Sequence, residues 1–369
     1  MRTYTLATAF LAGCALATPV PQDLDWDAIE SLDPIETPSI PVVDAKAAET
    51  TMAYVSAAAA SAVASAVAAS PEDSTITIAG RGIAEAVPRN NANCTRQPAA
   101  NDTPKNFSAR YSSNATEVSG YTTAYFNRNG SSEGVYGYMG YSVLDTYNPS
   151  QCAERCNANK GCSSFNIYYE RDPSVTPKDG CSNPPSTVVI KCVYYGGPVT
   201  PQSATNVGQY QGDFHVVIAG SNGYVRKSIA TPDGYSGLTA LGNGAIQAPL
   251  DCNGKDTYMG VKIFQGKPFD TGLCAAACTA QSKYNREHPG KNGYFQTCQF
   301  FNTYVLYNGT TAVGQYCSLY NETWPASFAT NVGQWRGKDY FSIGYSYSFS
   351  NSTGGVDKPT GCNNPTSPK

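Results

Sequence analysis

The sequence predicts an α+β protein in which two disulfide-stapled modules follow a disordered or marginally helical leader. Each module is expected to have one helix packed on an antiparallel β-sheet. Two observations lead to this prediction. Twelve of the 13 cysteines lie after residue 93 of the 369-residue chain. The cysteine-bearing part also repeats itself, since Cys152-Ala-Glu-Arg-Cys156 matches Cys274-Ala-Ala-Ala-Cys278.

Further short motifs recur in the same order, with offsets of about 120 to 136 residues. They are Tyr138-Met139-Gly140 with Tyr258-Met259-Gly260, Phe165-Asn166-Ile167-Tyr168 with Phe301-Asn302-Thr303-Tyr304, Cys192 with Cys317, and 204–209 with 329–334, both reading Ala-Thr-Asn-Val-Gly-Gln. A constant order with small changes of offset indicates a duplication with loop insertions. Repeats of this length are whole small domains and not solenoid units.

The composition divides the chain into six segments. They are a signal peptide (1–17), a low-complexity Ala-rich leader or pro-segment (18–92), a first unit (93–220), a Gly-, Pro- and Asn-rich linker (221–250), a second unit (251–362) and a tail (363–369).

The first segment has the features of a secretory signal. Arg2 precedes an apolar stretch from Tyr4 to Leu16, and Ala15-Leu16-Ala17 fits a cleavage site. Cleavage would remove Cys14 and leave twelve cysteines, an even number that suits disulfides in an oxidising compartment. We therefore expect a secreted or extracellular protein, free or associated with the cell wall, with no membrane span.

The leader carries an alanine tract with a helical period. Its larger side chains recur every three or four residues, at Met52, Val55, Ala59, Val63 and Val67. Ser70-Pro71 would end this helix. A pro-segment or stalk is one interpretation. Because alanine buries little area, we favour a flexible leader that the rest of the protein does not need for folding.

Within each unit the spacing predicts a helix followed by strands. Cys152 and Cys156 are four residues apart and so face the same side of a helix. The stretch 164–169 is rich in β-favouring residues, and 214–218 and 340–343 are expected to be closing strands. A zinc site at Cys-x3-Cys is disfavoured, because it needs thiolates that an exported chain would oxidise.

These residues resemble PAN/Apple modules of secreted fungal cysteine-rich proteins. The resemblance covers about 94–362 and depends on the helical Cys-x3-Cys, on Gly161-Cys-Ser-Ser-Phe-Asn-Ile-Tyr168 and on a later cysteine in another strand. It implies a five-stranded antiparallel sheet around one helix. It also implies binding to proteins or glycans without catalysis.

The resemblance also implies a disulfide pattern, whereas spacing alone leaves 15 connectivities for six cysteines. The implied pairs are Cys152–Cys192, Cys156–Cys162, Cys274–Cys317 and Cys278–Cys298. Cys252 and Cys362 would then close the second unit, and Cys94 and Cys181 remain for the first.

Eight N-x-Ser/Thr sequons are candidate glycosylation sites in an exported chain. They are Asn93, Asn101, Asn106, Asn114, Asn129, Asn308, Asn321 and Asn351. Tyrosines near the cysteines are candidate ligand contacts, because tyrosine offers a flat apolar face and a hydroxyl. They are Tyr168, Tyr169, Tyr194, Tyr195, Tyr304 and Tyr320. The alternative, which we favour for any one of these rings, is that they fill a small core.

The charge and motif content excludes several classes. A net charge of −3, from 25 basic and 28 acidic residues, argues against nucleic-acid binding. Two histidines leave little room for a metal or triad site, and we expect no cofactor. The units share no carboxylate pair, so a glycoside hydrolase could use only Glu154, Glu170 and Asp172 of the first.

We therefore expect a non-catalytic binding protein whose partner is a cell-wall glycan or an extracellular protein. A structural cell-wall glycoprotein without a specific ligand is the alternative. A hydrolase confined to one unit is the less favoured one. The sequence leaves the oligomeric state open.

Overall fold

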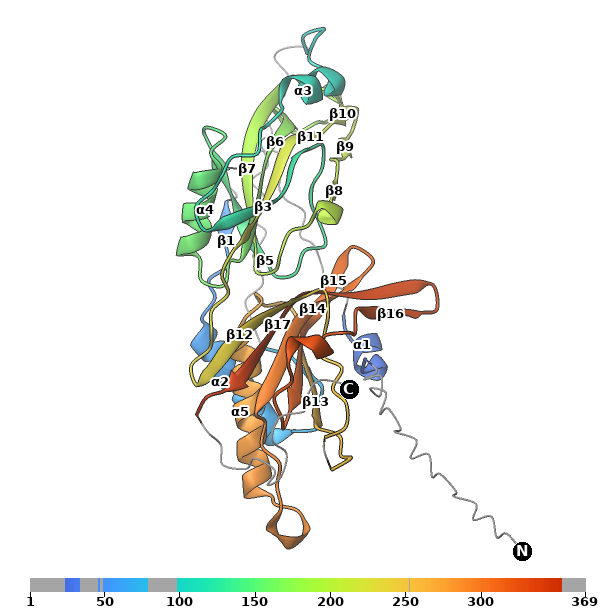
Figure 1. Ribbon diagram of the computed structural model, residues 1–369. Helices are drawn as coiled ribbons and strands as arrows, with labels where there is room; N and C mark the ends of the chain where they lie inside the picture. Colours follow the sequence, from blue (N-terminus) through green and yellow to red (C-terminus); the bar gives the residue numbers. More distant parts are fainter. Residues whose placement is uncertain (1–23, 34–45, 47–48, 79–97, 252, 354–369) are drawn as a thin grey trace, which may run out of the picture.

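The structure is a computed structural model that describes residues 24–33, 46, 49–78, 98–251 and 253–353. It has mixed α+β architecture, consisting mostly of β-sheet with few helices (Figure 1). Four disulfides are described, and they join the pairs Cys152–Cys192, Cys156–Cys162, Cys274–Cys317 and Cys278–Cys298. These are the pairs that the resemblance implies.

The other cysteine assignments fall partly or wholly outside the described residues. Cys181 is disulfide-bonded, but its expected partner Cys94 is not described. Cys252, Cys362, the signal peptide, the tail 363–369 and Asn93 also lie outside the described residues.

The first large sheet has six antiparallel strands in the order β1-β5-β7-β6-β11-β3. Their bounds are Thr50–Thr51 (β1), Tyr121–Arg128 (β3), Tyr138–Leu144 (β5), Ser164–Pro173 (β6), Ser186–Tyr195 (β7) and Val217–Arg226 (β11). Helix α4, Pro149–Ala158, begins after the N-cap Asn148 and precedes β6 in the chain. The disulfide between Cys152 and Cys192 joins α4 to β7.

The second large sheet has seven strands. The path runs β12-β17-β14-β15-β13-β2, and β16 pairs with β17. The bounds are Thr75–Ile76 (β2), Tyr235–Gly242 (β12), Tyr258–Phe264 (β13), Phe300–Asn308 (β14), Thr311–Tyr320 (β15), Gly333–Arg336 (β16) and Asp339–Asn351 (β17). Helix α5, Thr271–Glu287, is joined to β15 by Cys274–Cys317.

Five strands follow the same order in both sheets. The order β5-β7-β6-β11-β3 corresponds to β13-β15-β14-β17-β12. The Tyr-Met-Gly motif opens β5 and β13, and the Phe-Asn motif lies in β6 and β14. The duplication seen in the sequence is therefore also a duplication of strand order.

The remaining elements are short, apart from α2. They are α1 (Trp26–Glu30), α2 (Ser56–Ala69), α3 (Pro104–Arg110), β4 (Ser131–Ser132), β8 (Ala204–Asn206), β9 (Tyr210–Gln211), β10 (Phe214–His215) and the 3-10 turns η1 (Pro201–Ser203), η2 (Lys291–Gly293) and η3 (Ala326–Phe328). Among the described residues, no helix is long and apolar enough to span a bilayer.

The leader is more than the flexible segment we expected. Helix α2 ends at Ala69, just before Ser70-Pro71 as its sequence predicts, but Val63 and Val67 are fully buried and α2 packs along α5. Strand β1 pairs with β5, and β2 pairs in parallel with β13. The expectation that this region buries little surface is wrong for residues 49–78. Val63 and Val67 belong to the same buried cluster as Leu273 and Ala277 of α5, and the small alanine side chains of α2 allow its close packing on α5.

The stretch 221–250 is not the linker that its Gly- and Pro-rich composition indicated. Its first residues belong to β11, which lies between β6 and β3 of the first sheet. Strand β12, also within the stretch, is an edge strand of the second sheet. Only residues 227–234 connect the two sheets here. This Gly-rich stretch can form strands because a β-sheet accommodates glycines at irregular positions such as bulges.

The two large sheets contact each other through a small apolar cluster. It contains Tyr136 from the first half and Phe269, Val305 and Ala312 from the second. Three hydrogen bonds cross the same boundary. The Tyr136 hydroxyl donates to the Phe264 carbonyl (2.9 Å), Phe269 N to Gly196 O (3.1 Å), and Ala312 N to Gly134 O (2.9 Å).

Candidate functional site

The repeated Ala-Thr-Asn-Val-Gly-Gln segment leads into an exposed hairpin in the first half. Strands β9 and β10 form this hairpin, which we call the first aromatic hairpin (204–215). Val207 is 60% exposed and Tyr210 is 69% exposed. The Tyr210 ring stacks on His215 with 4.2 Å between centroids and an interplanar angle of 8°.

The second copy of the segment leads into an equivalent hairpin, the second aromatic hairpin (329–341), formed by β16 and the start of β17. Val332 is 54% exposed and Trp335 is 70% exposed. The Trp335 ring lies 5.1 Å from the Tyr340 ring, tilted by 48°. Both halves thus present a valine and an aromatic ring to solvent at matching positions of the repeat.

The asparagine and the glycine of the repeat build the same turn twice. Gly208 N donates to Asn206 Oδ1, and Gly333 N donates to Asn331 Oδ1, each over 3.0 Å. The φ angles of Gly208 and Gly333 are +102° and +117°, and a Cβ there would come within 2.1 and 2.0 Å of a facing carbonyl oxygen. Glycine is therefore required at both turns.

The Phe-Asn motif supports the base of each hairpin. Asn166 Oδ1 accepts from Ser132 N, in the strand β4 that pairs with β8. Asn302 Oδ1 accepts from Ile246 N, beside the bridge between Ala245 and Asn331. The two repeated motifs are thus connected, because the buried asparagine fixes the segment on which the hairpin begins.

The repeated segment contributes only in part to the framework. Asn206 and Gly208 do so, but the exposed valine and the following aromatic residue contribute nothing to the core. Tyr210 and Trp335 were not among our candidate residues. The signal was present in the sequence, since an aromatic residue follows both copies of the segment.

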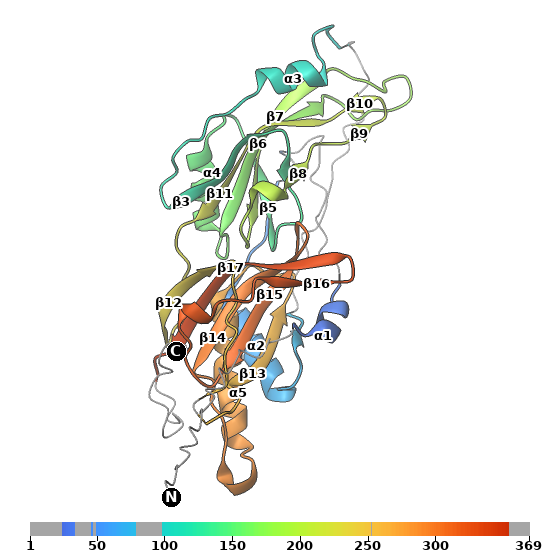
Figure 2. The same cartoon turned by 45° about the vertical axis from the view of Figure 1, so that its right-hand side comes forward.

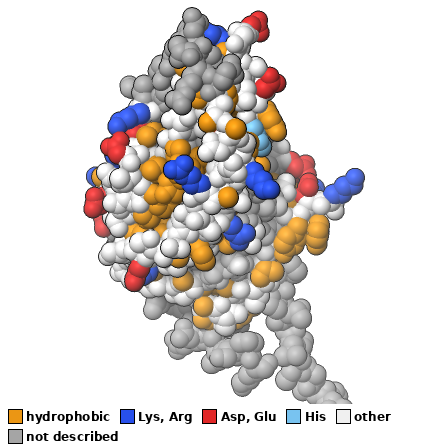
Figure 3. All heavy atoms as spheres, turned by 90° about the horizontal axis from the view of Figure 1, so that it is seen from above, with side chains coloured by type: hydrophobic (Ala, Val, Ile, Leu, Met, Phe, Trp, Pro, Cys, Tyr) orange, Lys and Arg blue, Asp and Glu red, His pale blue; other side chains and the backbone are white. Residues whose placement is uncertain are grey.

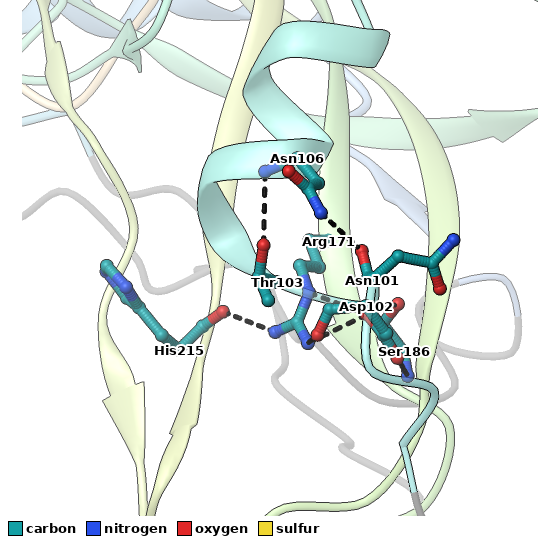
Figure 4. A network of polar contacts seen from close by, with 7 residues as sticks. All are labelled: Asn101, Asp102, Thr103, Asn106, Arg171, Ser186 and His215. Carbon is teal, nitrogen blue, oxygen red and sulfur yellow. Dashed lines mark hydrogen bonds and ion pairs between the residues drawn. The ribbon is translucent and has the colours of Figure 1, made fainter.

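A buried arginine holds the first aromatic hairpin (Figure 4). Arg171 of β6 donates to the His215 carbonyl oxygen over 2.8 Å and to Asp102 Oδ1 from two nitrogens, at 2.9 and 3.2 Å. Its guanidinium also lies 4.1 Å from the centre of the Phe214 ring. Asp102 in turn accepts from the Ser186 backbone N at 2.7 Å. This network ties β10 to β6, β7 and the segment before α3.

The carboxylate of Asp102 is ionised within this network. Partial burial of Asp102 raises its pKa, but hydrogen bonds from Ser186 and Arg171 outweigh burial and leave the pKa below its usual value. The result is a charge-assisted pair in which two N–H donors of Arg171 converge on the same oxygen, Asp102 Oδ1.

The second aromatic hairpin is supported by the leader instead. Arg336 forms an ion pair with Glu30 of α1 (3.2 Å) and lies 5.1 Å from the centre of the Trp26 ring. Trp26 meets Phe341 edge-to-face at 5.0 Å. The two hairpins therefore expose similar side chains but are supported by different contacts.

The candidate tyrosines are mostly core residues. Tyr168, Tyr194, Tyr195, Tyr304 and Tyr320 are all buried, and only Tyr169 is partly exposed. The Tyr195 hydroxyl donates to the Ser132 carbonyl and that of Tyr320 to the Ile246 carbonyl. Burial raises the pKa of Tyr304 to about 12. Five of the six rings thus cannot meet a ligand at the surface. Tyr194 and Tyr195 are neighbours in β7 and belong to different buried clusters, so both faces of this sheet are covered there.

The candidate carboxylates do not come together in an accessible site. Glu154 is exposed on α4. Glu170 is buried in contact with Lys191, and Asp172 is fully buried with no hydrogen-bond partner for either oxygen. Burial first, and then the charge of Glu170, raise the pKa of Asp172 well above its usual value. A substrate would not reach Glu170 or Asp172 without opening the sheet.

The described sequons differ in accessibility. Asn101, Asn106, Asn114, Asn129 and Asn308 are exposed, whereas Asn321 and Asn351 are half-buried. Asn351 is also engaged, since its Oδ1 accepts from Thr353 N and its Nδ2 donates to the Cys298 carbonyl. Use of any sequon stays a prediction.

An open groove of about 970 Å³ runs between α2 and α5. Its floor is mainly alanine, including Ala60, Ala64 and Ala276, with Lys160 and Lys283 at its rim. Within the described ranges, no three His, Cys, Asp or Glu side chains lie close enough to bind a metal ion together.

Comparison with known proteins adds no assignment. No protein family and no curated protein matches this chain.

Proposed function

We propose that this chain is a secreted, glycosylated binding protein of the cell surface or wall, which uses two PAN/Apple-like modules and has no catalytic activity. In this proposal each module consists of one helix packed on a five-stranded antiparallel sheet, and each presents one aromatic hairpin to a glycan or protein.

The single observation that carries the proposal is the repeated pair of exposed side chains, Val207 with Tyr210 and Val332 with Trp335. These side chains are exposed at matching positions of both copies and contribute nothing to the core, which supports a role outside folding. Tyrosine and tryptophan are also enriched at binding surfaces, because their rings offer large rigid contact area. The identical turn geometry supports the same role for both.

Burial of Glu170 and Asp172 supports the absence of catalysis. A general acid or base needs to come within hydrogen-bond reach of a reacting atom. The alternative of a structural wall glycoprotein is favoured by the exposed sequons at Asn101, Asn106, Asn114 and Asn129, which would cover the first half with glycans.

The test uses the full secreted chain on a glycan array and in pull-downs from extracellular extract. The variants are Tyr210→Ala and Trp335→Ala, alone and combined. Tyr294→Ala is the matched control, since Tyr294 is 58% exposed but lies outside both hairpins. We expect the double variant to lose at least 10-fold in affinity and the control to behave as wild type. A wild-type chain that binds nothing would favour the structural alternative.

A further inference from the structure

We infer that the two aromatic hairpins bind one ligand together, and that this ligand is a neutral, linear polysaccharide. This inference rests on the proposed function and narrows it to one ligand class and one mode of binding.

The two aromatic hairpins lie on one side of the molecule. In Figures 1 and 2 the β9–β10 hairpin and the β16–β17 hairpin lie on the same side of the elongated molecule, one above the other. In Figure 3, which looks down on the β9–β10 end, hydrophobic and charged side chains stand out at the right-hand edge, the side from which the β16–β17 hairpin projects in Figure 1. A long ligand running along this side would meet both.

Contacts between the two sheets hold the two hairpins at a fixed spacing. The cluster of Tyr136, Phe269, Val305 and Ala312 and three hydrogen bonds hold the two sheets against each other. Each hairpin is in turn fixed to its sheet, by Arg171 in one case and by the continuous strand β17 in the other. Two sites at fixed spacing gain avidity only from a ligand that spans both.

The two hairpins share the same side-chain chemistry. The rings of Tyr210 and Trp335 stand out from the surface as open platforms, which suit an internal segment of a chain. An exposed glutamine, Gln209, and a half-buried one, Gln334, precede the rings and offer amide groups for hydroxyls. A ring face for the sugar's C–H groups, with amides for its hydroxyls, is an arrangement suited to a saccharide.

The two hairpins differ in their charged residues. Asp213 is the only acidic or basic residue at 204–215, apart from His215. The stretch 329–341 carries Arg336, Lys338 and Asp339, and Arg336 is already paired with Glu30. A polyanion or a polycation would therefore meet unlike charges at its two contacts, whereas a neutral polymer would meet the same ring chemistry twice.

The experiment measures binding of the full chain to chitin and to linear β-1,3-glucan, as neutral polymers, and to their tetrasaccharides. Polygalacturonate and chitosan serve as charged comparators. The variants are Tyr210→Ala, Trp335→Ala, the double variant and the control Tyr294→Ala. We expect the wild type to bind one neutral polymer at least 10-fold more tightly than its tetrasaccharide. Each single variant should lose that advantage, and the double variant should lose binding.

The outcomes separate this inference from the proposed function. If both single variants keep the full preference for polymer, or if only a charged polymer binds and salt abolishes the binding, the inference is overturned while a binding function stands. Binding to a protein alone, with no polysaccharide retained, overturns it as well. A double variant that binds as tightly as wild type would refute both, because the hairpins would then not be the site.

Discussion

The hydroxyl of Tyr54 donates a hydrogen bond to the carboxylate of Asp270 over 2.7 Å, although the two residues lie 216 positions apart. The same carboxylate caps α5 by accepting from Gly272 N at 2.7 Å, and it also accepts from Ser56 at the start of α2. One side chain thus fixes the first turns of two helices. The leader is thereby joined to the second sheet at the point where the cysteine-bearing helix begins.

Truncating the leader's buried valine should destabilise the protein. Val63→Ala removes two methyl groups from the interface between α2 and α5, and we expect a loss of about 1–3 kcal/mol in the free energy of unfolding. The matched control is Val55→Ala, since Val55 is 63% exposed and its loss should cost less than about 0.5 kcal/mol. Denaturant unfolding under oxidising conditions measures both. Equal effects would mean that α2 does not pack on α5 in solution.

The buried carboxyl of Asp172 should make the protein less stable as the pH rises. Its folded pKa is raised by burial, whereas the unfolded chain releases this proton at about pH 3.9. The folded state therefore binds more protons above that pH, and the free energy of unfolding should fall by up to about 1.4 kcal/mol per pH unit until the folded pKa is reached.

Asp172→Asn should remove this dependence, so that the stability of the variant relative to wild type increases as the pH rises above about 4. Asp102 should change the stability with pH in the opposite direction, because its folded pKa is lowered. Asp102→Asn should therefore cost stability at neutral pH, and the difference should shrink as the pH falls below about 4. Unfolding curves at several pH values test both. Parallel pH profiles for the two variants would contradict these assignments.

Replacing Arg171 by lysine should loosen the first aromatic hairpin. A lysine keeps the charge but loses the planar fork that reaches Asp102 and the His215 carbonyl together. We expect a loss of about 1.5–3 kcal/mol for the charge-assisted contacts and faster amide hydrogen exchange at 210–215. Arg336→Lys is the control, since its ion pair with Glu30 is exposed and contributes little. Unchanged exchange at 210–215 would show that Arg171 does not hold this hairpin.

The disulfides should differ in their contribution to stability according to the length of chain that they close. Cys152–Cys192 closes 40 residues and Cys156–Cys162 closes six. Chain entropy then predicts that removing the first pair costs about 1.7 kcal/mol more than removing the second. In the second half, Cys274–Cys317 closes 43 residues and Cys278–Cys298 closes 20. The difference in stability loss between these two pairs should therefore be only about 0.7 kcal/mol. Paired Cys→Ala variants and denaturant unfolding measure this, and a larger difference in the second half would contradict it.

Local patterns in the sequence predicted a good part of the fold. Cys152 and Cys156 indicated a helix because they share a face, and the spacing of Ala59, Val63 and Val67 indicated another. The closing strands at 214–218 and 340–343 lie within strand-rich regions, interrupted at Val216. The disulfide pairing, in contrast, came from the family resemblance, because spacing alone does not select one connectivity.

Long-range contacts explain what the sequence did not predict. Whether α2 is marginal or buried depends on α5, which follows it by about two hundred residues, and no local pattern reports that contact. Burial of Tyr168 and Tyr304 depends on both faces of β6 and β14 being covered, which strand alternation alone does not predict. The exposure of Tyr210 and Trp335 was not predicted, because framework residues and exposed residues alternate within the repeated segment and only the structure distinguishes them.

The two short leader strands have a consequence for solubility. Strands β1 and β2 lie at corresponding edges of the two large sheets, on β5 and on β13. An uncovered edge strand presents unpaired N–H and C=O groups that recruit strands from other chains. Proteolytic loss of residues 49–78 would uncover these edges at Gly140–Tyr141 of β5 and at Ile263–Phe264 of β13, in addition to the outer edges that β3 and β12 form in the described sheets. At these positions the leader reduces the strand edge that is open to pairing with another chain.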